Sequence, residues 1–224
     1  MKLVALCSGG KDSTLALYLA LQEGHEVSKI VVMVPSRSDS WMYHWPNVEL
    51  MDLFADAVGI KAVKMQTSGE PEREVEDLKR VLSGLDVDGV VSGAVASTYQ
   101  KSRIDHVCKE LGLHSVAPLW GRDPAEVLRE SIHSGFEILI TAVAAEGFNE
   151  NWLGRRLDEN CYRELLKLHE RFGIDLVGEG GEYETFVVDG PIFKKRIEVL
   201  EAERNWSGTR GYYLIERAVL EGKP

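Results

Sequence analysis

Short apolar runs alternate with longer amphipathic stretches along the first half of the chain. The runs have the length of buried strands, and the stretches between them repeat apolar residues at helical spacing. The predicted strands cover residues 2–7, 29–34, 61–66, 88–92 and 114–118. The first predicted helix begins at Thr14, and three further helices cover residues 48–58, 71–82 and 97–111. This alternation predicts a parallel, Rossmann-like sheet of five strands with helices on both faces.

The second half of the chain has a different pattern. We expect a helix over residues 123–134, a strongly apolar strand over 136–144 and an amphipathic helix over 158–172. From Tyr183 onward, strands alternate with tight-turn signals. The pattern therefore predicts two domains: residues 1–118 form the parallel α/β domain, and residues 119–224 form a smaller α+β C-terminal lobe.

The composition is that of a soluble globular protein. Of the 224 residues 44% are hydrophobic, and the longest apolar runs are well short of the roughly 18 residues that a membrane span needs. The chain enters a strand at once, so we expect no signal peptide and a cytoplasmic location. Three cysteines without CxxC spacing indicate free thiols rather than a zinc or iron–sulfur site. The net charge of −10 argues against stable nucleic-acid binding.

Candidate chemistry begins directly after the first apolar run, at the segment SGGKDS (residues 8–13). A strand, two glycines and a helix start form a phosphate cradle, because glycine lets backbone N–H groups approach an anion and the helix N-terminus adds positive charge. Lys11 adds a full charge and Ser13 a hydroxyl donor. Asp12 would repel a phosphate alone, so its presence indicates a Mg²⁺ ion that bridges the phosphates.

The segment is not a Walker A loop, which would need glycine at position 5 and serine or threonine at position 12. The chain has Ala5 and Asp12 there. SGGKDS instead resembles the pyrophosphate loop of the PP-loop ATP pyrophosphatases, which have a HUP-type sheet. Members of that superfamily cleave ATP between the α and β phosphates and adenylate a carbonyl or carboxylate oxygen. The resemblance implies that Ser8, Gly9, Gly10, Lys11, Asp12 and Ser13 bind ATP and that Asp12 holds Mg²⁺.

Two further segments stand out, and each has an ordinary structural explanation as well. The segment SGAVASTYQ (residues 92–100) leaves the fourth predicted strand with small residues, which suits either a close-lying nucleotide or a tight strand-to-helix connection. The segment EGGEYET (residues 179–185) sets two glycines among three carboxylates. It can surround a cation or an amine, or it can be an acidic surface turn.

Together, SGGKDS, GAVASTYQ and EGGEYET resemble the diphthine–ammonia ligase family of PP-loop enzymes, over nearly the whole chain. The resemblance implies amidation of diphthine, a modified histidine of translation elongation factor 2, with ATP and ammonium. The residues it implies for the nucleotide beyond the first loop are Met33, Ser92 and Gly93. Those it implies for the acceptor or ammonium are His44, Asn47, Tyr99, Gln100, Glu179, Gly180, Gly181, Glu182, Tyr183, Glu184 and Thr185. Lys11, Asp12, Glu182 and Glu184 make up the expected catalytic set.

An aromatic-rich segment follows the second predicted strand. Trp41, Tyr43 and Trp45 lie within five positions, at the sheet end where ligands bind. We expect some of these rings to receive the trimethylammonium group of diphthine through cation–π contacts, with Tyr99 and Trp120 as weaker candidates. A hydrophobic lid or a contact between lobes is the alternative role.

Three other functions remain open from the sequence. A tRNA-modifying PP-loop enzyme would favour a basic surface or catalytic cysteines, and the charge and cysteine spacing argue against both. Nothing in the sequence excludes a related amide ligase that acts on a small carboxylate, because motifs do not define the acceptor pocket. A nucleotide-sensing module would hold ATP without turning it over.

Overall fold

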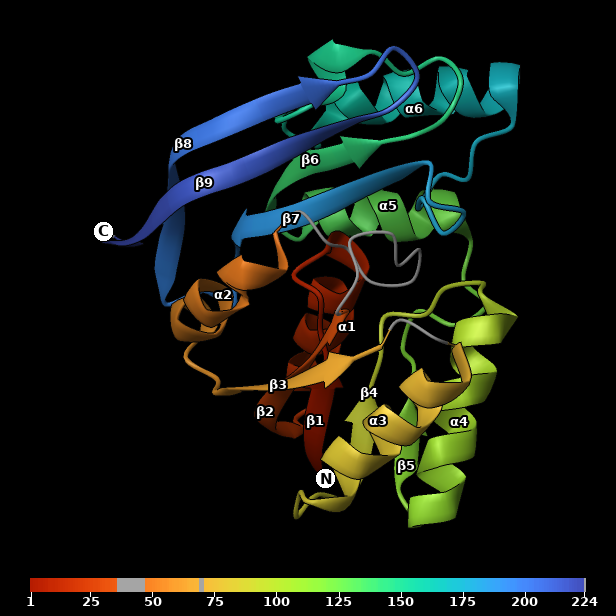
Figure 1. Cartoon of the computed structure of the whole chain (residues 1–224), viewed down its shortest axis with the longest axis vertical. Helices are drawn as coiled ribbons and strands as arrows, with labels where there is room; N and C mark the ends of the chain where they lie inside the picture. The colour runs from red at the N-terminus through yellow and green to blue at the C-terminus, as the bar shows by residue number, and fades with distance from the viewer. Residues whose placement is uncertain (36–46, 69–70, 224) are drawn as a thin grey trace.

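The computed structural model describes residues 1–35, 47–68 and 71–223 (Figure 1). The first half forms a five-stranded sheet in the order β3-β2-β1-β4-β5, and all four pairings are parallel. Its strands are β1 (Lys2–Leu6), β2 (Glu26–Pro35), β3 (Ala62–Thr67), β4 (Gly89–Val91) and β5 (His114–Val116). The predicted parallel sheet is therefore confirmed.

The second strand is longer than its apolar run predicts. It begins at Glu26 rather than at residue 29, because Glu26 pairs with Lys2 of β1 and donates its N–H to the Met1 carbonyl. Backbone pairing with a neighbouring strand thus extends β2 over Glu26, Val27 and Ser28, of which Val27 is buried in the core. A single apolar residue between two polar ones is too short a pattern to predict a strand.

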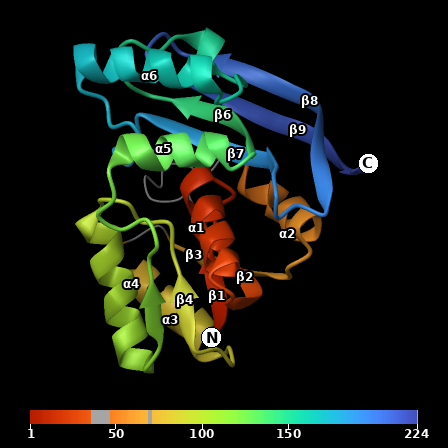
Figure 2. The same cartoon turned by 180° about the vertical axis from the view of Figure 1, so that it is seen from behind.

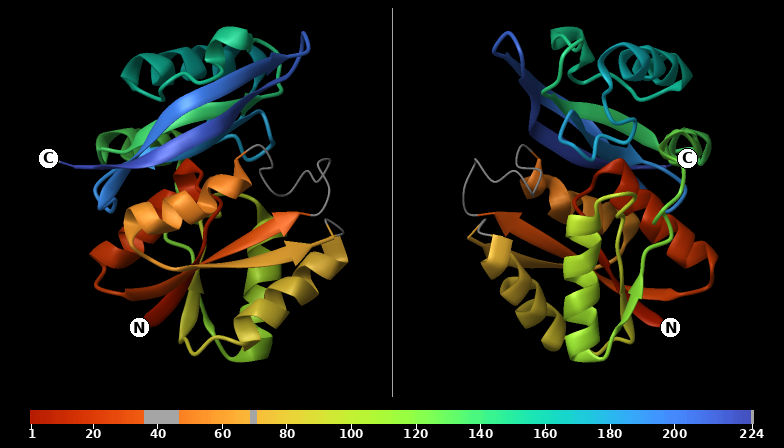
Figure 3. Two further views of the ribbon diagram at one scale, coloured as in Figure 1. Left: turned by 60° about the vertical axis from the view of Figure 1, so that its left-hand side comes forward. Right: turned by 90° about the vertical axis from the view of Figure 1, so that its right-hand side faces the viewer.

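Four helices connect these strands and cover both faces of the sheet. They are α1 (Lys11–Gln22), α2 (Met51–Val58), which follows the 3₁₀ turn η1 (Val48–Leu50), α3 (Pro71–Ser83) and α4 (Thr98–Leu111). Gly59 and Gly112 end α2 and α4 in the left-handed conformation, and the Ser97 side chain caps the start of α4. Helices α1 and α2 pack on one face, and α3 and α4 pack on the other (Figures 1 and 3).

The second half forms an antiparallel sheet in the order β7-β6-β9-β8. Its strands are β6 (Glu137–Val143), β7 (Tyr183–Asp189), β8 (Lys195–Trp206) and β9 (Gly211–Gly222), and its helical segments are α5 (Pro124–His133), η2 (Glu150–Trp152) and α6 (Glu159–Phe172). Asp123 and Asp158 cap α5 and α6 with their carboxylates. The predicted helix and strand types of this half are confirmed.

Helices α1 and α2 lie between the two sheets, and α6 covers the face of the antiparallel sheet that is turned away from them (Figure 3). Viewed from behind, α1 lies against the parallel sheet with α5 above it (Figure 2). Leu15 and Leu17 of α1 are fully buried, and the Phe54 ring of α2 meets the Phe186 ring of β7 at 6.2 Å. One apolar core therefore continues from the first half into the second. The expected domain boundary at residue 119 stays a prediction.

The topology sets where the predicted motifs lie. Because β1 and β4 are parallel neighbours, with Ala5 beside Val91, the loops that leave them begin side by side. Strand β7 reaches the same place from the other sheet, since Val187 donates its N–H to the Gly9 carbonyl at 2.8 Å. In the described part of the chain, no helix is both long and apolar enough to cross a membrane.

Candidate active site

The loop between β1 and α1 packs tightly against the antiparallel sheet. Gly9 has φ +80°, and a β-carbon there would lie 2.5 Å from the Phe186 ring. Gly10 caps α1 in an extended conformation, and the Lys11 N–H that follows is donated to Thr185 Oγ1 at 3.1 Å. The first glycine is thus required for contact with β7, as well as for the turn that exposes the start of α1.

The Lys11 side chain joins this loop to the second half of the chain. Its ammonium donates to the Val177 carbonyl and to Asp12 Oδ2, the latter at 2.7 Å, and lies 5.3 Å from the Tyr183 ring centre. Lys11 is only 3% exposed. Tyr183 donates its hydroxyl to the Leu176 carbonyl, and burial raises its pKa well above the ordinary value, so the ring stays a neutral support for the cation.

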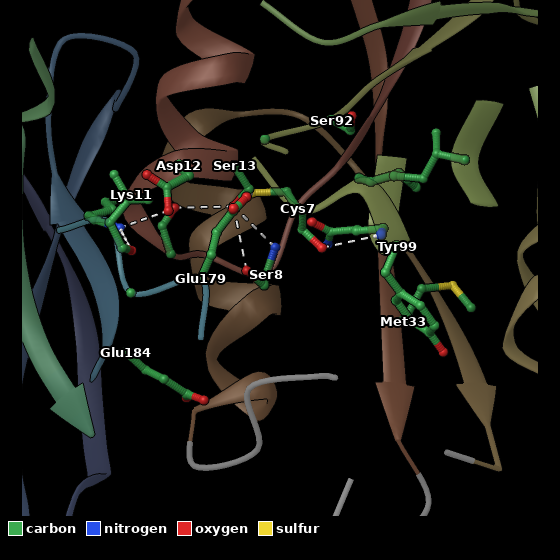
Figure 4. Close-up of a pocket in the computed structure, with 18 of the residues that line it drawn as sticks. Cys7, Ser8, Lys11, Asp12, Ser13, Met33, Ser92, Tyr99, Glu179 and Glu184 are labelled. Atoms are coloured by element: carbon green, nitrogen blue, oxygen red, sulfur yellow. Dashed lines mark hydrogen bonds and ion pairs between the residues drawn. The ribbon is translucent and has the colours of Figure 1, made fainter. Parts of the chain in front are cut away.

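Hydroxyl and thiol groups surround the start of α1 (Figure 4). Ser13 Oγ donates to the Gly10 carbonyl at 3.1 Å and accepts the Ser8 N–H at 3.3 Å. Cys7 Sγ lies 3.4 Å from the same hydroxyl, and burial raises the pKa of its thiol. The Cys7 thiol is therefore protonated near neutral pH, which argues against a role as a nucleophile.

The two other predicted segments meet each other at the same place. The Glu179 carboxylate accepts the N–H groups of Val95 and Ala96, each at 2.9 Å. Gly93 lies against the start of α1, where a β-carbon would be 2.6 Å from the Ser13 nitrogen. The small residues after β4 thus admit α1 and receive Glu179, which the sequence does not reveal.

One pocket of about 440 Å³ lies where these segments meet. Its lining comes from the ends of β1 and β2, from the start of α1, from α3 and α4, and from residues 177–185. The predicted site residues that line it are Ser8, Gly10, Lys11, Asp12, Ser13, Met33, Ser92, Gly93, Tyr99, Gln100, Glu179, Gly180, Gly181, Tyr183, Glu184 and Thr185. The labelled members surround a common space, with Glu184 set apart from the Lys11–Asp12 pair (Figure 4).

Among the predicted site residues that the structure describes, three do not line this pocket. Gly9 contacts β7, as described above. Glu182 Oε1 accepts the Asp175 N–H at 3.0 Å within its own loop, and the catalytic role expected of Glu182 stays a prediction. Asn47 is 5% exposed and bonds to the backbone of β9 through both amide atoms, so its role is to hold α2 and its preceding turn against the second sheet.

Most of the aromatic residues predicted to receive the trimethylammonium group lie outside the described residues. Trp41, Tyr43, Trp45 and the predicted site residue His44 all belong to residues 36–46. Of the two remaining candidates, Tyr99 lines the pocket, and Trp120 does not. The Lys101 ammonium lies 5.8 Å from the Trp120 ring centre, so that ring already has a cation beside it.

The predicted site residues include Tyr99 and Gln100 at the start of α4, but none from α3 or from further along α4, which also line the pocket. Glu74, Val75 and Leu78 line the pocket from α3, and Arg103 and Ile104 line it from α4. Neither helix carries a recognisable motif there. The only available signal is topological. In a parallel sheet the helix that follows β3 begins at the same edge of the sheet as the loop after β1.

The donors and acceptors of the pocket fit a magnesium-bound polyphosphate. The start of α1 supplies N–H groups and positive potential for an anion. Among the described residues, no group of three or more histidine, cysteine, aspartate or glutamate side chains is placed to hold a metal. A single carboxylate such as that of Asp12 nevertheless suffices for Mg²⁺, which commonly uses one or two carboxylates together with substrate phosphates.

Comparison with known proteins gives concordant matches along the chain. Residues 1–115 match the model for the diphthamide synthase N-terminal domain, and residues 123–220 match that for the C-terminal domain. The diphthine–ammonia ligase of Rattus norvegicus is 37% identical over 226 residues, covering 91% of this chain and 84% of that protein. The enzyme of the same name from Schizosaccharomyces pombe is 36% identical, and the chain spans 40% of its length.

A solved structure gives a weaker match. It is described as the predicted subunit of a tRNA methyltransferase from Methanocaldococcus jannaschii DSM, and it is 18% identical with a TM-score of 0.46. The match covers 88% of this chain and 99% of that one. We draw nothing from it.

Proposed function

Because the chain belongs to the diphthamide synthase family, whose named relatives are diphthine–ammonia ligases, we propose that it amidates diphthine on translation elongation factor 2. The other substrates are ATP and ammonium, and the products are the amide, AMP and pyrophosphate. The observation that carries the proposal is the convergence of three segments on one pocket: the loop at the start of α1, the loop after β4, and residues 179–185. We place the reaction in the cytoplasm, where elongation factor 2 works.

The start of α1 is the proposed binding site for the phosphates of ATP. Its N–H groups and the hydroxyls of Ser8 and Ser13 face the pocket, and the macrodipole of the helix favours negative charge there. The Lys11 ammonium lies at the edge of the pocket with Asp12 beside it. Asp12 is the proposed ligand of Mg²⁺, which would neutralise phosphate charge. Lys11 would reach the phosphates by leaving the Val177 carbonyl.

The chemistry follows from the weakness of a carboxylate as an electrophile. An oxygen of diphthine attacks the α-phosphorus, the bond to the β-phosphate oxygen breaks, and pyrophosphate leaves. Ammonia then attacks the acyl carbon, and AMP departs with the original oxygen. Charge accumulates on the leaving pyrophosphate in the first step, so donors fixed at the start of α1 stabilise that transition state.

Residues 179–185 form the proposed acceptor side of the pocket. Glu184 lines it from β7, and Gly180 and Gly181 expose backbone there. A carboxylate on this side suits the positively charged trimethylammonium group of diphthine. Ammonium must lose one proton to become the attacking ammonia, and the nitrogen loses a second as the amide forms. Water can take both protons, and we assign neither transfer to Glu184.

The test is release of AMP and pyrophosphate from Mg-ATP, with ammonium and diphthine-bearing elongation factor 2 each omitted in turn. The proposal predicts AMP release that needs both, and an acceptor mass lower by about one unit because OH is replaced by NH₂. Release of ADP would refute attack at the α-phosphate. AMP release without the elongation factor would assign the enzyme a different carboxylate.

A further inference from the structure

A buried carboxylate without a hydrogen-bond partner lies in the pocket wall that α3 supplies. Glu74 is 2% exposed and lines the pocket, and neither of its carboxylate oxygens has a partner among the described residues. Buried polar groups are almost always hydrogen-bonded, because leaving one unpaired costs stability. A group that breaks this rule inside a ligand pocket indicates a partner that arrives with the ligand.

The surroundings of Glu74 are mostly apolar, with one donor nearby. Met33, Leu78 and Ile104 line the same part of the pocket from β2, α3 and α4. The Arg103 guanidinium lies 3.3 Å from the Tyr99 ring centre, and its Nε also lacks a partner among the described residues. Burial raises the pKa of Glu74, which the charge of Arg103 partly opposes. The wall therefore offers an acceptor and a donor within an apolar hollow.

These features select one part of the nucleotide. A phosphate is repelled by a carboxylate and has its own donors at the start of α1. A purine ring suits the apolar wall, and among the parts of ATP adenine combines an N–H donor, its exocyclic amino group, with ring nitrogens that accept. We propose that Glu74 accepts a hydrogen bond from the exocyclic amino group of adenine, while Arg103 Nε donates to a ring nitrogen, so that this wall selects the base. The proposal rests on ATP being the substrate, as proposed above.

The binding test removes the acceptor from the protein and the donor from the ligand. Affinity is measured by calorimetry, with magnesium, for ATP and for purine riboside triphosphate, which lacks the amino group. The wild type should bind ATP roughly tenfold to hundredfold more tightly, as expected for a hydrogen bond to a charged group. Glu74→Leu should bring this ratio close to one, and Glu74→Gln, which keeps an acceptor oxygen, should restore part of it. Glu76→Leu, at an exposed position on the same helix, is the matched control.

A stability readout separates ligand recognition from a structural role. If Glu74 is kept for adenine, Glu74→Leu should raise the melting temperature of the nucleotide-free protein and shrink the further rise caused by ATP. A structural glutamate would give the opposite, a fall in the nucleotide-free melting temperature. That fall, with an unchanged preference for ATP, would overturn the proposal.

The remaining outcomes identify which proposal has failed. If the wild type does not bind ATP, the proposed function fails with this one. If it binds ATP and the purine analogue equally, the Glu74 assignment fails alone. If Glu74→Leu lowers the affinity for ATP but not for 2′- or 3′-deoxy-ATP, the contact of Glu74 belongs to the ribose. A raised KM for ammonium with unchanged ATP affinity would assign it to ammonium, and either result overturns the proposal.

Discussion

Replacing Glu179 tests whether the loop after β4 and residues 177–181 act as one unit. Its carboxylate accepts two backbone N–H groups, those of Val95 and Ala96, at 2.9 Å each. Hydrogen bonds to a charged acceptor contribute about 1.5–3 kcal/mol each, but Glu179 is only partly buried, so solvent replaces part of that. We expect Glu179→Ala to lower the free energy of unfolding by about 2–3 kcal/mol, and Glu179→Gln, which keeps one acceptor oxygen, to lower it by about half as much.

The assay is urea unfolding followed by tryptophan fluorescence, with Glu146→Ala at an exposed position as the control. For a chain of this length, about 2–3 kcal/mol corresponds to a fall in melting temperature of roughly 4–12 °C. ATP affinity should fall in the same order, alanine more than glutamine, because both segments line the pocket. If both Glu179 variants unfold within about 0.5 kcal/mol of wild type and bind ATP normally, the two segments are not coupled through this carboxylate.

Three further predictions concern packing, interdomain contacts and pH. Gly93→Ala places a β-carbon 2.6 Å from the Ser13 nitrogen, so it should displace the start of α1. ATP affinity measured by calorimetry should fall at least tenfold, which corresponds to about 1.4 kcal/mol. An affinity equal to that of the wild type would contradict the packing argument. Asn47→Ala removes two hydrogen bonds to the backbone of β9, so the free energy of unfolding in urea should fall by about 1–3 kcal/mol. ATP affinity should stay unchanged, and a reduced affinity would return Asn47 to the binding site. The hydrogen bond from Arg155 lowers the pKa of Glu164. The pair therefore stabilises the fold when the pH is above the ordinary glutamate pKa, and this stabilisation is lost as the pH falls through the lowered pKa of Glu164. Wild type and Glu164→Gln should differ in free energy of unfolding by about 0–1 kcal/mol, as expected for a surface pair. This difference should vanish as the protein is titrated with acid. A difference that grows in acid would contradict the predicted direction of the pH dependence.

Most helices and strands could be predicted because their signals are local. Gly59 and Gly112 end helices in the left-handed conformation, and Asp123 and Asp158 begin them with side-chain caps. Each of these effects involves a few neighbouring residues, so the pattern alone carries it. The extra residues of β2 were missed because they include one apolar residue, Val27, and the strand is extended there by backbone pairing with β1.

The site was predicted only in part, for a related reason. All residues of SGGKDS except Gly9 line the pocket, because strand, glycine turn and helix start are consecutive in the chain. Glu182 and Asn47 are chemically as suitable for binding as their neighbours. Yet Glu182 Oε1 accepts the Asp175 N–H, and both amide atoms of Asn47 bond to the backbone of β9. Residue type does not reveal which backbone group a side chain will meet.

The sequence by itself determined the alternation of strands and helices, the position of the glycine loop at the start of the first helix and the family to which the chain belongs. Only the tertiary structure decided that Glu179 bonds to Val95, 84 positions away, and that Glu74 is buried in the pocket wall with no hydrogen-bond partner among the residues that the structure describes. Helix caps, glycine turns and apolar periodicity act between near neighbours. Burial and hydrogen-bond partners depend on which distant segments the folded sheets bring together, and the free energy of a carboxylate is set by those surroundings.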